Sequence, residues 1–366
     1  MSWRHILRQY GPDFRSWLYS NQHRYKCFDE LANQLENFLK IILKDEDTCR
    51  TFWGMIPDVL AQCNENSIFE RPLAVEAYAY VHLLERYRRF WDVLLLLTEN
   101  AILPLGDYGI NVLDIGTGPA PALYAVDDYY RLLSEFADTQ EIEELQLPRP
   151  QLDCIELSQE MIRFCHHFAE YSNRFGPFRA TFPDFHGVDF PQIRQWERYR
   201  LAREGYDDPS TGEFEFDSTE AEAHDYAVAL FRYRMVILSN FLTLGDTVDT
   251  FQNEILSLFR DVNPGAVVVI VGAYGSPYPD IYAKVEIMAQ RSGIRHIQWV
   301  DEILGEQSWP QFAKRMKQFH YAIFEHITRF CDSNTLPREA YLDYWCPIPS
   351  TRYHPKFGLR VFRKGK

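Results

Sequence analysis

The segment that most constrains the fold is a short apolar run followed by a glycine-rich turn. The run is Asn111-Val-Leu-Asp-Ile, and the turn that follows it is Gly116-Thr-Gly-Pro119. The run predicts a strand, and the residues after the turn have helical spacing to about Phe136. A strand that leads through glycines into a helix brings backbone N–H groups and a helix N-terminus close to a ligand. We therefore expect a ligand-binding edge of a sheet at this turn.

Strand and helix patterns alternate after this turn. Further strands are predicted at residues 152–156, 178–182, 235–239 and 266–272, with helices at 159–175 and 248–262. Residues 267–271 are an unbroken β-branched run, which is typical of a strand covered on both faces. This alternation predicts an α/β fold with a parallel sheet and right-handed crossovers. The C-terminal part adds a predicted helix at about 310–330 and strands at 341–346 and 357–363.

The chain divides into two predicted regions and one insertion. Residues 1–104 have helical spacing and predict an all-helical N-terminal extension or cap, and residues 105–366 form the α/β domain. An acidic insertion occupies about residues 186–232, and within it the stretch from Glu204 to Asp225 has nine acidic residues and no Lys or Arg. Such a block is typical of a solvated loop, but a lid over the site or a docking surface for a basic partner remains open.

Charge and cysteine content exclude several classes of protein. With 52 acidic and 38 basic residues the formal charge is −14, which disfavours nonspecific nucleic-acid binding, although a local basic patch leaves an RNA substrate open. Seven scattered cysteines without a Cys-x-x-Cys pair indicate reduced thiols, not a disulfide framework or a zinc site. No apolar run is long enough for a membrane span, and the N-terminus lacks signal-peptide features. We therefore expect a cytoplasmic protein that binds no membrane; its oligomeric state is not indicated.

The details of the glycine turn separate two cofactor classes. A dinucleotide-binding fingerprint requires a third small residue, but Pro121 stands at that position here. Asp114, two residues before the first glycine, would repel a pyrophosphate and attract a cation. A nicotinamide-dependent oxidoreductase is therefore disfavoured, and a cationic ligand is favoured.

The segment Asp114-Ile-Gly116-Thr-Gly118 resembles the first motif of the class I (Rossmann-like) S-adenosylmethionine-dependent methyltransferases. Ile155-Glu156 resembles the end of that family's second strand, and Met235-Val-Ile-Leu-Ser-Asn240 its fourth strand and loop. One departure is that Glu156 lies 38 residues beyond Gly118, whereas such an acid usually follows about 20 residues on; residues 129–150 account for the difference as an extension. The resemblance covers about residues 105–366 and implies a mostly parallel seven-stranded sheet with an antiparallel C-terminal strand.

The resemblance also implies roles for individual residues. Asp114 would serve the cationic methionine moiety, the backbone of Gly116, Thr117 and Gly118 would allow close approach of the cofactor, and Glu156 would accept both ribose hydroxyls. Asp184 is the candidate for the adenine amino group. Asn240 is a further cofactor-binding candidate and, with Phe241, would face the transferring methyl group. The candidates for the acceptor pocket are Tyr78, Phe241 and Tyr274.

Other polar residues have no firm role at this stage. One of Arg86, Arg88 and Arg89 could clamp the cofactor carboxylate, because Arg recognises carboxylates with two hydrogen bonds, or the three could form a solvated face. His186, His224 and Tyr274 lie near the relevant loops, but no catalytic base can be named. The adjacent His166 and His167 have no partner at metal-ligand spacing, so no metal site is predicted.

These observations predict S-adenosylmethionine-dependent methyl transfer to a small-molecule or protein acceptor. The Asn/Asp-Pro-Pro-Tyr motif typical of amino-group methylation in nucleic-acid bases is missing after the fourth strand. An RNA methyltransferase stays open as an alternative, as does a non-catalytic interaction module that keeps the methyltransferase fold.

Overall fold

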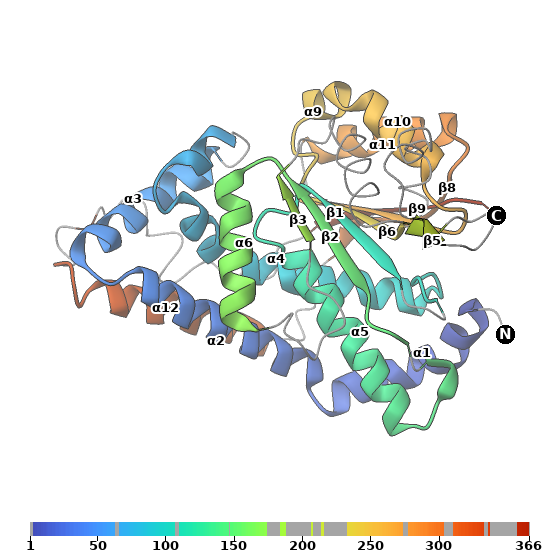
Figure 1. Cartoon of the computed structure of the whole chain (residues 1–366), viewed down its shortest axis with the longest axis horizontal. Helices are drawn as coiled ribbons and strands as arrows, with labels where there is room; N and C mark the ends of the chain where they lie inside the picture. The colour runs from blue at the N-terminus through green and yellow to red at the C-terminus, as the bar shows by residue number, and fades with distance from the viewer. Residues whose placement is uncertain are drawn as a thin grey trace.

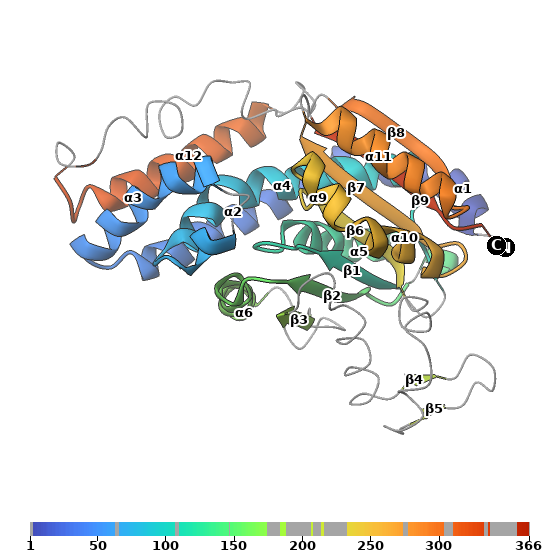
Figure 2. The same cartoon turned by 90° about the horizontal axis from the view of Figure 1, so that it is seen from above.

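The computed structural model describes residues 3–62, 66–106, 110–145, 147–173, 184–187, 206–207, 214–215, 233–273, 277–303, 310–332, 336 and 357–365. In this part of the chain a mixed sheet is covered by helices on both faces (Figures 1 and 2). No helix in these ranges combines the length and apolarity that crossing a membrane requires.

The sheet has the strand order β3-β2-β1-β6-β7-β9-β8. Its strands are β1 (Asn111–Ile115), β2 (Gln151–Glu156), β3 (Asp184–Gly187), β6 (Tyr233–Ser239), β7 (Val267–Ala273), β8 (Arg295–Ile303) and β9 (Phe357–Arg363). The pairs from β3 to β7 are parallel, whereas β9 runs antiparallel to both β7 and β8. This confirms the predicted α/β class with an antiparallel C-terminal strand. The strand β8 and the helix before it were not predicted from the sequence.

Alternating side chains of the central strands point to two separate cores. Val112, Ile237 and Val269 lie in the core shared with the N-terminal helices, and their neighbours Leu113 and Val268 lie in the core on the other face. The second core is completed by α9 (Gly245–Thr250), α10 (Gln252–Asp261) and α11 (Tyr278–Arg291). Both faces of the sheet are therefore covered, which explains why its strands read as nearly continuous apolar runs.

The N-terminal part of the chain is helical, as its spacing predicts. Its elements are α1 (Trp3–Ser20), α2 (His23–Ile42), α3 (Glu46–Gln62), the 3₁₀ helix η1 (Asn66–Glu70) and α4 (Ala74–Glu99). Helix α4 packs against α5 (Pro121–Thr139), and the Tyr87 hydroxyl on α4 donates to Asp128 on α5 at 2.7 Å. The N-terminal helices therefore join the sheet through α5.

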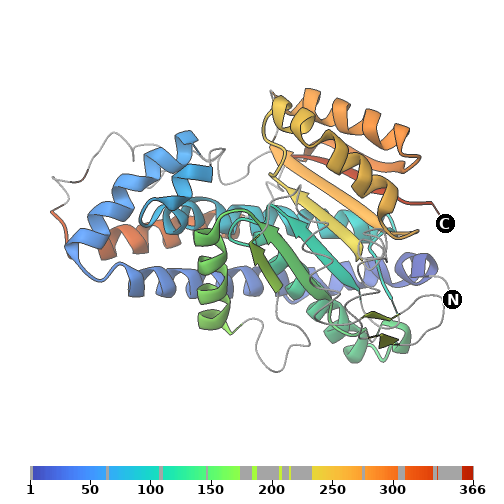
Figure 3. The ribbon, with the colours of Figure 1, turned by 45° about the horizontal axis from the view of Figure 1, so that its top comes forward.

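Two further helices complete this layer. Helix α6 (Gln159–Ser172) follows β2, and α12 (Pro310–Ile327) packs against α2. The guanidinium of Arg315 on α12 forms an ion pair with Asp29 and donates to Asn33 at 2.7 Å, both on α2. In Figures 1 and 3, α3 and α12 extend beyond the edge of the sheet. The 3₁₀ helix η2 (Glu143–Leu145) and the antiparallel pair β4 (Tyr206–Asp207) and β5 (Phe214–Glu215) are the remaining described elements.

Several sequence predictions fall on residues outside the described ranges. These are the strands at 178–182 and 341–346 and, apart from β4, β5 and the last two residues of β3, the acidic insertion at 186–232. The other strands and helices predicted after residue 104 are present within one to a few residues of the predicted bounds.

Candidate functional site

The turn after β1 has the backbone conformation that its glycines predict. Gly116 and Gly118 have φ angles of +67° and +56°, and Ala120 before α5 has +60°. These angles are strained for residues with a Cβ, which explains the two glycines. The Gly116 N–H donates to the Ile155 carbonyl at 2.8 Å, so the pairing of β1 with β2 continues into the turn. Helix α5 then begins at Pro121, where a missing N–H costs no helical hydrogen bond.

Asp114 lies beneath this turn with 1% of its surface exposed. Its Oδ2 accepts the Thr117 hydroxyl at 2.7 Å, whereas Oδ1 is buried and meets no donor among the described residues. Burial raises the pKa of this carboxyl to about 7, and the nearby charge of Glu156 adds to the shift. A buried carboxylate oxygen without a donor is costly, so the site favours a proton or a positive ligand at this point.

Glu156 ends β2 and is fixed against the same turn. Its Oε2 accepts the Gly118 N–H at 2.8 Å, and its Oε1 accepts the N–H groups of Leu157 and Ser158 at 2.9 and 3.1 Å. Burial raises the pKa of this carboxyl, while these backbone donors lower it in part. The extended spacing between Gly118 and Glu156 therefore does not prevent the two from meeting, because residues 129–150 complete α5 and η2 before β2 begins.

The loop after β6 approaches the turn from the next strand. Asn240 has a φ of +56°, and its N–H donates to the Val271 carbonyl at 2.7 Å. Its side-chain oxygen accepts from Arg89 on α4 at 2.9 Å. The Phe241 ring lies directly against Gly116, because a Cβ added to that glycine would come within 2.3 Å of the ring. The turn and this loop therefore meet at the carboxyl edge of adjacent parallel strands.

A cavity of about 360 Å³ lies beside this loop, between α4 and the ends of β6 and β7. One face of α4 supplies five of its eleven lining residues, on successive turns of the helix. Within that face the Arg86 guanidinium contacts the Tyr78 hydroxyl, and Arg89 forms an ion pair with Glu85. The lining residues are Tyr78, His82, Glu85, Arg86, Arg89, Asn240, Thr243, Leu244, Ala273, Pro277 and Tyr278.

The structure brings most of the sequence-derived site residues together at this edge. The turn carries Asp114, Gly116, Thr117 and Gly118; Glu156, Asn240 and Phe241 surround it, and the Tyr78 ring would lie 3.7 Å from a Cβ on Gly118. Tyr274 and His224 lie outside the described residues. Arg86 and Arg89, named from the sequence, line the cavity. Helical spacing from Tyr78 could also have found His82 and Glu85, but Thr243 and Tyr278 join the cavity only through the fold.

Two candidates do not reach the site. The prediction that Asp184 follows the third strand is wrong, because Asp184 begins β3 and pairs with Asp153, three residues before Glu156. Asp184 is therefore displaced from the carboxyl edge, where Gly187 pairs with Glu156. Of the three arginines, Arg88 lies over the Phe312 ring at 5.8 Å and does not line the cavity.

Searches with known families and curated proteins found no match to this sequence. Solved structures that resemble it include the cyclopropane synthase MmaA2 from Mycobacterium tuberculosis, 10% identical with a TM-score of 0.40, over 81% of this chain and 85% of that one. Magnesium protoporphyrin IX methyltransferase from Synechocystis PCC 6803, solved with bound SAM, is 11% identical with a TM-score of 0.36, over 77% and 81%. Both likenesses concern the arrangement of elements alone.

The strand order of this chain decides the fold. Strand β1 lies between β2 and β6, and β9 inserts antiparallel between β7 and β8. This is the mostly parallel seven-stranded sheet with an antiparallel C-terminal strand that the resemblance of residues 105–366 to the class I methyltransferases implies. The order of strands reverses beside β1, and open α/β sheets bind ligands in the crevice at such a reversal. The turn, Glu156 and Asn240 all lie there. Within the described ranges no group of three His, Cys, Asp or Glu side chains is placed to hold a metal ion.

Proposed function

We propose that this protein transfers the methyl group of S-adenosylmethionine to a small-molecule or protein acceptor. The observation that carries the proposal is the buried Oδ1 of Asp114, which meets no donor among the described residues and lies beside a turn of two positive-φ glycines. A ligand with a positive charge would compensate this carboxylate, and a pyrophosphate would be repelled by it. Pro121, which stands where a dinucleotide-binding motif requires a small residue, also argues against a dinucleotide and for a cationic ligand.

The residues around the turn fit such a nucleoside. Gly116 and Gly118 leave the backbone without side chains on the approach, and Glu156 is fixed by three N–H groups at the end of β2. Glu156 would hold the ribose hydroxyls, Asp114 would serve the methionine moiety, and Asn240 would complete the cofactor site. S-Adenosylmethionine, when bound, supplies a methyl group already activated on a sulfonium sulfur.

The acceptor would enter the cavity beside Asn240. Tyr78 lines this cavity and would lie 3.7 Å from a Cβ on Gly118, which supports its place in the acceptor pocket. Phe241 contacts Gly116 but does not line the cavity. Because an activated methyl group needs an acceptor held in line, orientation by the walls of the cavity would supply most of the acceleration. No side chain is assigned as a base, and one is needed only for an acceptor that must lose a proton.

One observation favours a second candidate, a non-catalytic interaction module with the methyltransferase fold. The Phe241 ring covers Gly116, on the side where a ligand would approach that glycine. The ring is only partly buried, so it can turn aside, but a module that binds no nucleoside would keep it in place.

Titration calorimetry with S-adenosylmethionine separates the two candidates. We expect the wild-type protein to bind, and Glu156→Ala to bind roughly ten- to a hundredfold more weakly, because charged hydrogen bonds are lost. Glu160→Ala, four residues further on the exposed face of α6, is the matched control and should bind as the wild type does. Thermal unfolding of each variant shows whether it is folded. Absence of binding by the wild-type protein would favour the module.

The reaction itself is tested by mass spectrometry. Purified protein and isotope-labelled S-adenosylmethionine are incubated with cell extract, and small molecules and proteins are analysed separately. We expect one acceptor to gain a labelled methyl group, and its fraction identifies the class of acceptor. A labelled RNA with no labelled metabolite or protein would contradict the proposed acceptor class.

A further inference from the structure

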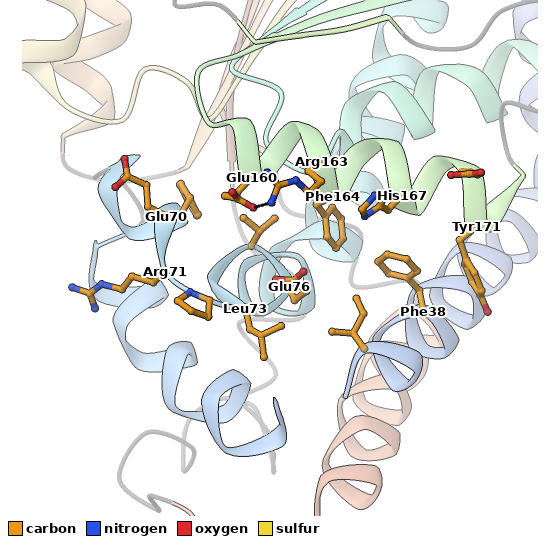
Figure 4. A pocket seen from close by; sticks show the side chains of 15 residues that line it. Phe38, Glu70, Arg71, Leu73, Glu76, Glu160, Arg163, Phe164, His167 and Tyr171 are labelled. Atoms are coloured by element: carbon orange, nitrogen blue, oxygen red, sulfur yellow. Dashed lines mark hydrogen bonds and ion pairs between the residues drawn. The ribbon is translucent and has the colours of Figure 1, made fainter. Parts of the chain in front are cut away.

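A second and larger cavity, of about 690 Å³, lies away from the glycine turn. It is enclosed by the end of α2, by η1 and the start of α4, and by one side of α6 (Figure 4). Its lining shares no residue with the cavity beside Asn240. Nothing in the proposed methyl transfer uses it.

The Glu76 carboxylate is the central charge of this cavity. In Figure 4 it lies in the middle of the lining, below α6. Among the described residues, no other side chain forms a hydrogen bond or an ion pair with it. Burial raises the pKa of Glu76 and the charge of Glu160 raises it further, whereas a hydrogen bond from its own backbone N–H and the charge of His167 lower it in part. Its own backbone N–H compensates this carboxylate in part, but no described Lys or Arg side chain is paired with it.

Both guanidinium groups of the lining form ion pairs with carboxylates other than Glu76. Arg163 is paired with Glu160 at 2.6 Å, and Arg71 is paired with Asp58 at 2.9 Å. Figure 4 shows Arg71 directed away from Glu76. With those pairs neutralised, the excess charge of the cavity is negative. An anionic ligand would be repelled, and a neutral ligand would bury Glu76 without a counter-ion.

Aromatic rings form the opposite wall. Phe38 contacts Phe164 with ring centroids 5.6 Å apart and nearly perpendicular planes, and it contacts Tyr171 at 5.3 Å. No described Lys or Arg lies over any of these three rings. Tyr171 is 41% exposed, so this wall reaches the surface. Ring faces attract ammonium groups and their methyl substituents, most strongly where water is excluded.

We propose that this cavity binds an organic ammonium ion with Glu76 as its counter-ion and the rings of Phe38, Phe164 and Tyr171 around its alkyl groups. The ion is an amine or methylated amine with an apolar body, either a free small molecule or a methylated lysine side chain. The proposal is independent of methyl transfer, since the cavity shares no lining residue with the acceptor site. It assigns a second binding site to the helical layer of the protein.

The test uses the full chain and benzyltrimethylammonium as the probe, measured by titration calorimetry. Benzyl alcohol and benzoate provide the neutral and anionic comparisons. We expect the cation to bind, and Glu76→Gln to weaken its binding at least roughly tenfold, because a buried charge pair is lost. Phe38→Leu keeps an apolar side chain but removes a ring, and it should weaken binding severalfold. Glu144→Gln, an exposed change on η2, is the control and should leave binding unchanged.

Two readouts keep the result unambiguous. Without ligand, Glu76→Gln should unfold at an equal or higher temperature, because an uncompensated carboxylate is removed; this shows that the variant is folded. S-Adenosylmethionine binding should be unchanged in Glu76→Gln. The proposed ammonium site and the proposed methyl-transfer site are therefore tested independently of each other. A trimethyllysine peptide that binds more tightly than the free probe identifies a protein ligand, and the reverse identifies a small molecule. Equal binding of benzoate, or undiminished cation binding by Glu76→Gln, would overturn the proposal.

Discussion

At the scale of single residues, the two glycines of the turn differ in what surrounds them. Both have positive φ angles, +67° for Gly116 and +56° for Gly118. A Cβ on Gly116 would come within 2.3 Å of the Phe241 ring, whereas one on Gly118 would lie 3.7 Å from the nearest atom, on Tyr78. Backbone strain is therefore shared by both positions, and a steric clash is confined to Gly116.

Gly116→Ala should accordingly destabilise the protein more than Gly118→Ala does. Backbone strain costs both variants about 1–2 kcal/mol, and displacement of Phe241 from its stack with Phe251 adds about 1–3 kcal/mol to the first. Urea unfolding of both variants measures the difference. In a Phe241→Ala background the two substitutions should cost the same. A difference that persists there would show that Phe241 is not its cause.

Asp114 gives a pH dependence with a definite sign. The pKa of its carboxyl is about 7 in the folded protein, whereas the ordinary value, expected for the unfolded chain, is 3.8. Between these two pH values the folded state therefore keeps a proton that the unfolded chain releases. Between these values stability therefore falls as pH rises, by at most about 1.4 kcal/mol per pH unit. Asn at this position does not titrate. The melting temperature of Asp114→Asn relative to wild type should rise from about pH 5 to about pH 8, and a constant difference would contradict the assignment.

At the scale of elements, the sequence predicted correctly those strands and helices whose structure is determined by the residues of one segment. The run Asn111–Ile115 and the β-branched run in Val267–Ala273 became β1 and β7, and the helical spacing of residues 1–100 became α1 to α4. The glycine turn was found for the same reason, whereas Glu156 was found through the resemblance, and its bond to the Gly118 N–H joins residues 38 apart in sequence.

Elements and contacts that depend on distant segments were not predictable in this way. Strand β8 (Arg295–Ile303) mixes polar and apolar residues without a regular alternation, and its place is set by pairing with β9, about 60 residues later. Asp184 was placed at the end of a strand that instead begins there. On α4 the sequence named Tyr78, Arg86 and Arg89 but missed His82 and Glu85 of the same cavity, because the helix is largely buried and its polar positions lie among apolar ones.

At the scale of the whole molecule, the predicted division at residue 104 does not separate two cores. One continuous core contains Trp53 and Trp91 from the N-terminal helices, Phe136 from α5 and Ile237 from the sheet. The buried ion pair between Arg24 and Asp92 and the hydrogen bond from Tyr87 to Asp128 link α2, α4 and α5 in series. Breaking such buried polar pairs is costly, because each leaves an uncompensated group inside the protein.

We therefore expect the helical region and the α/β region to fold as one cooperative unit. During urea unfolding, tryptophan fluorescence, far-ultraviolet circular dichroism and near-ultraviolet circular dichroism should give coincident transitions. A fragment of residues 105–366 would expose the face of α5 that α4 covers, so it should lack a sharp thermal transition and bind hydrophobic dyes. Two separated transitions in the full chain, or a fragment that melts cooperatively, would instead establish residues 1–104 as an independent cap. Tyr78 and Arg89 of α4 line the acceptor cavity. If residues 1–104 unfolded independently, the cavity would therefore lose this wall while the glycine turn stayed folded.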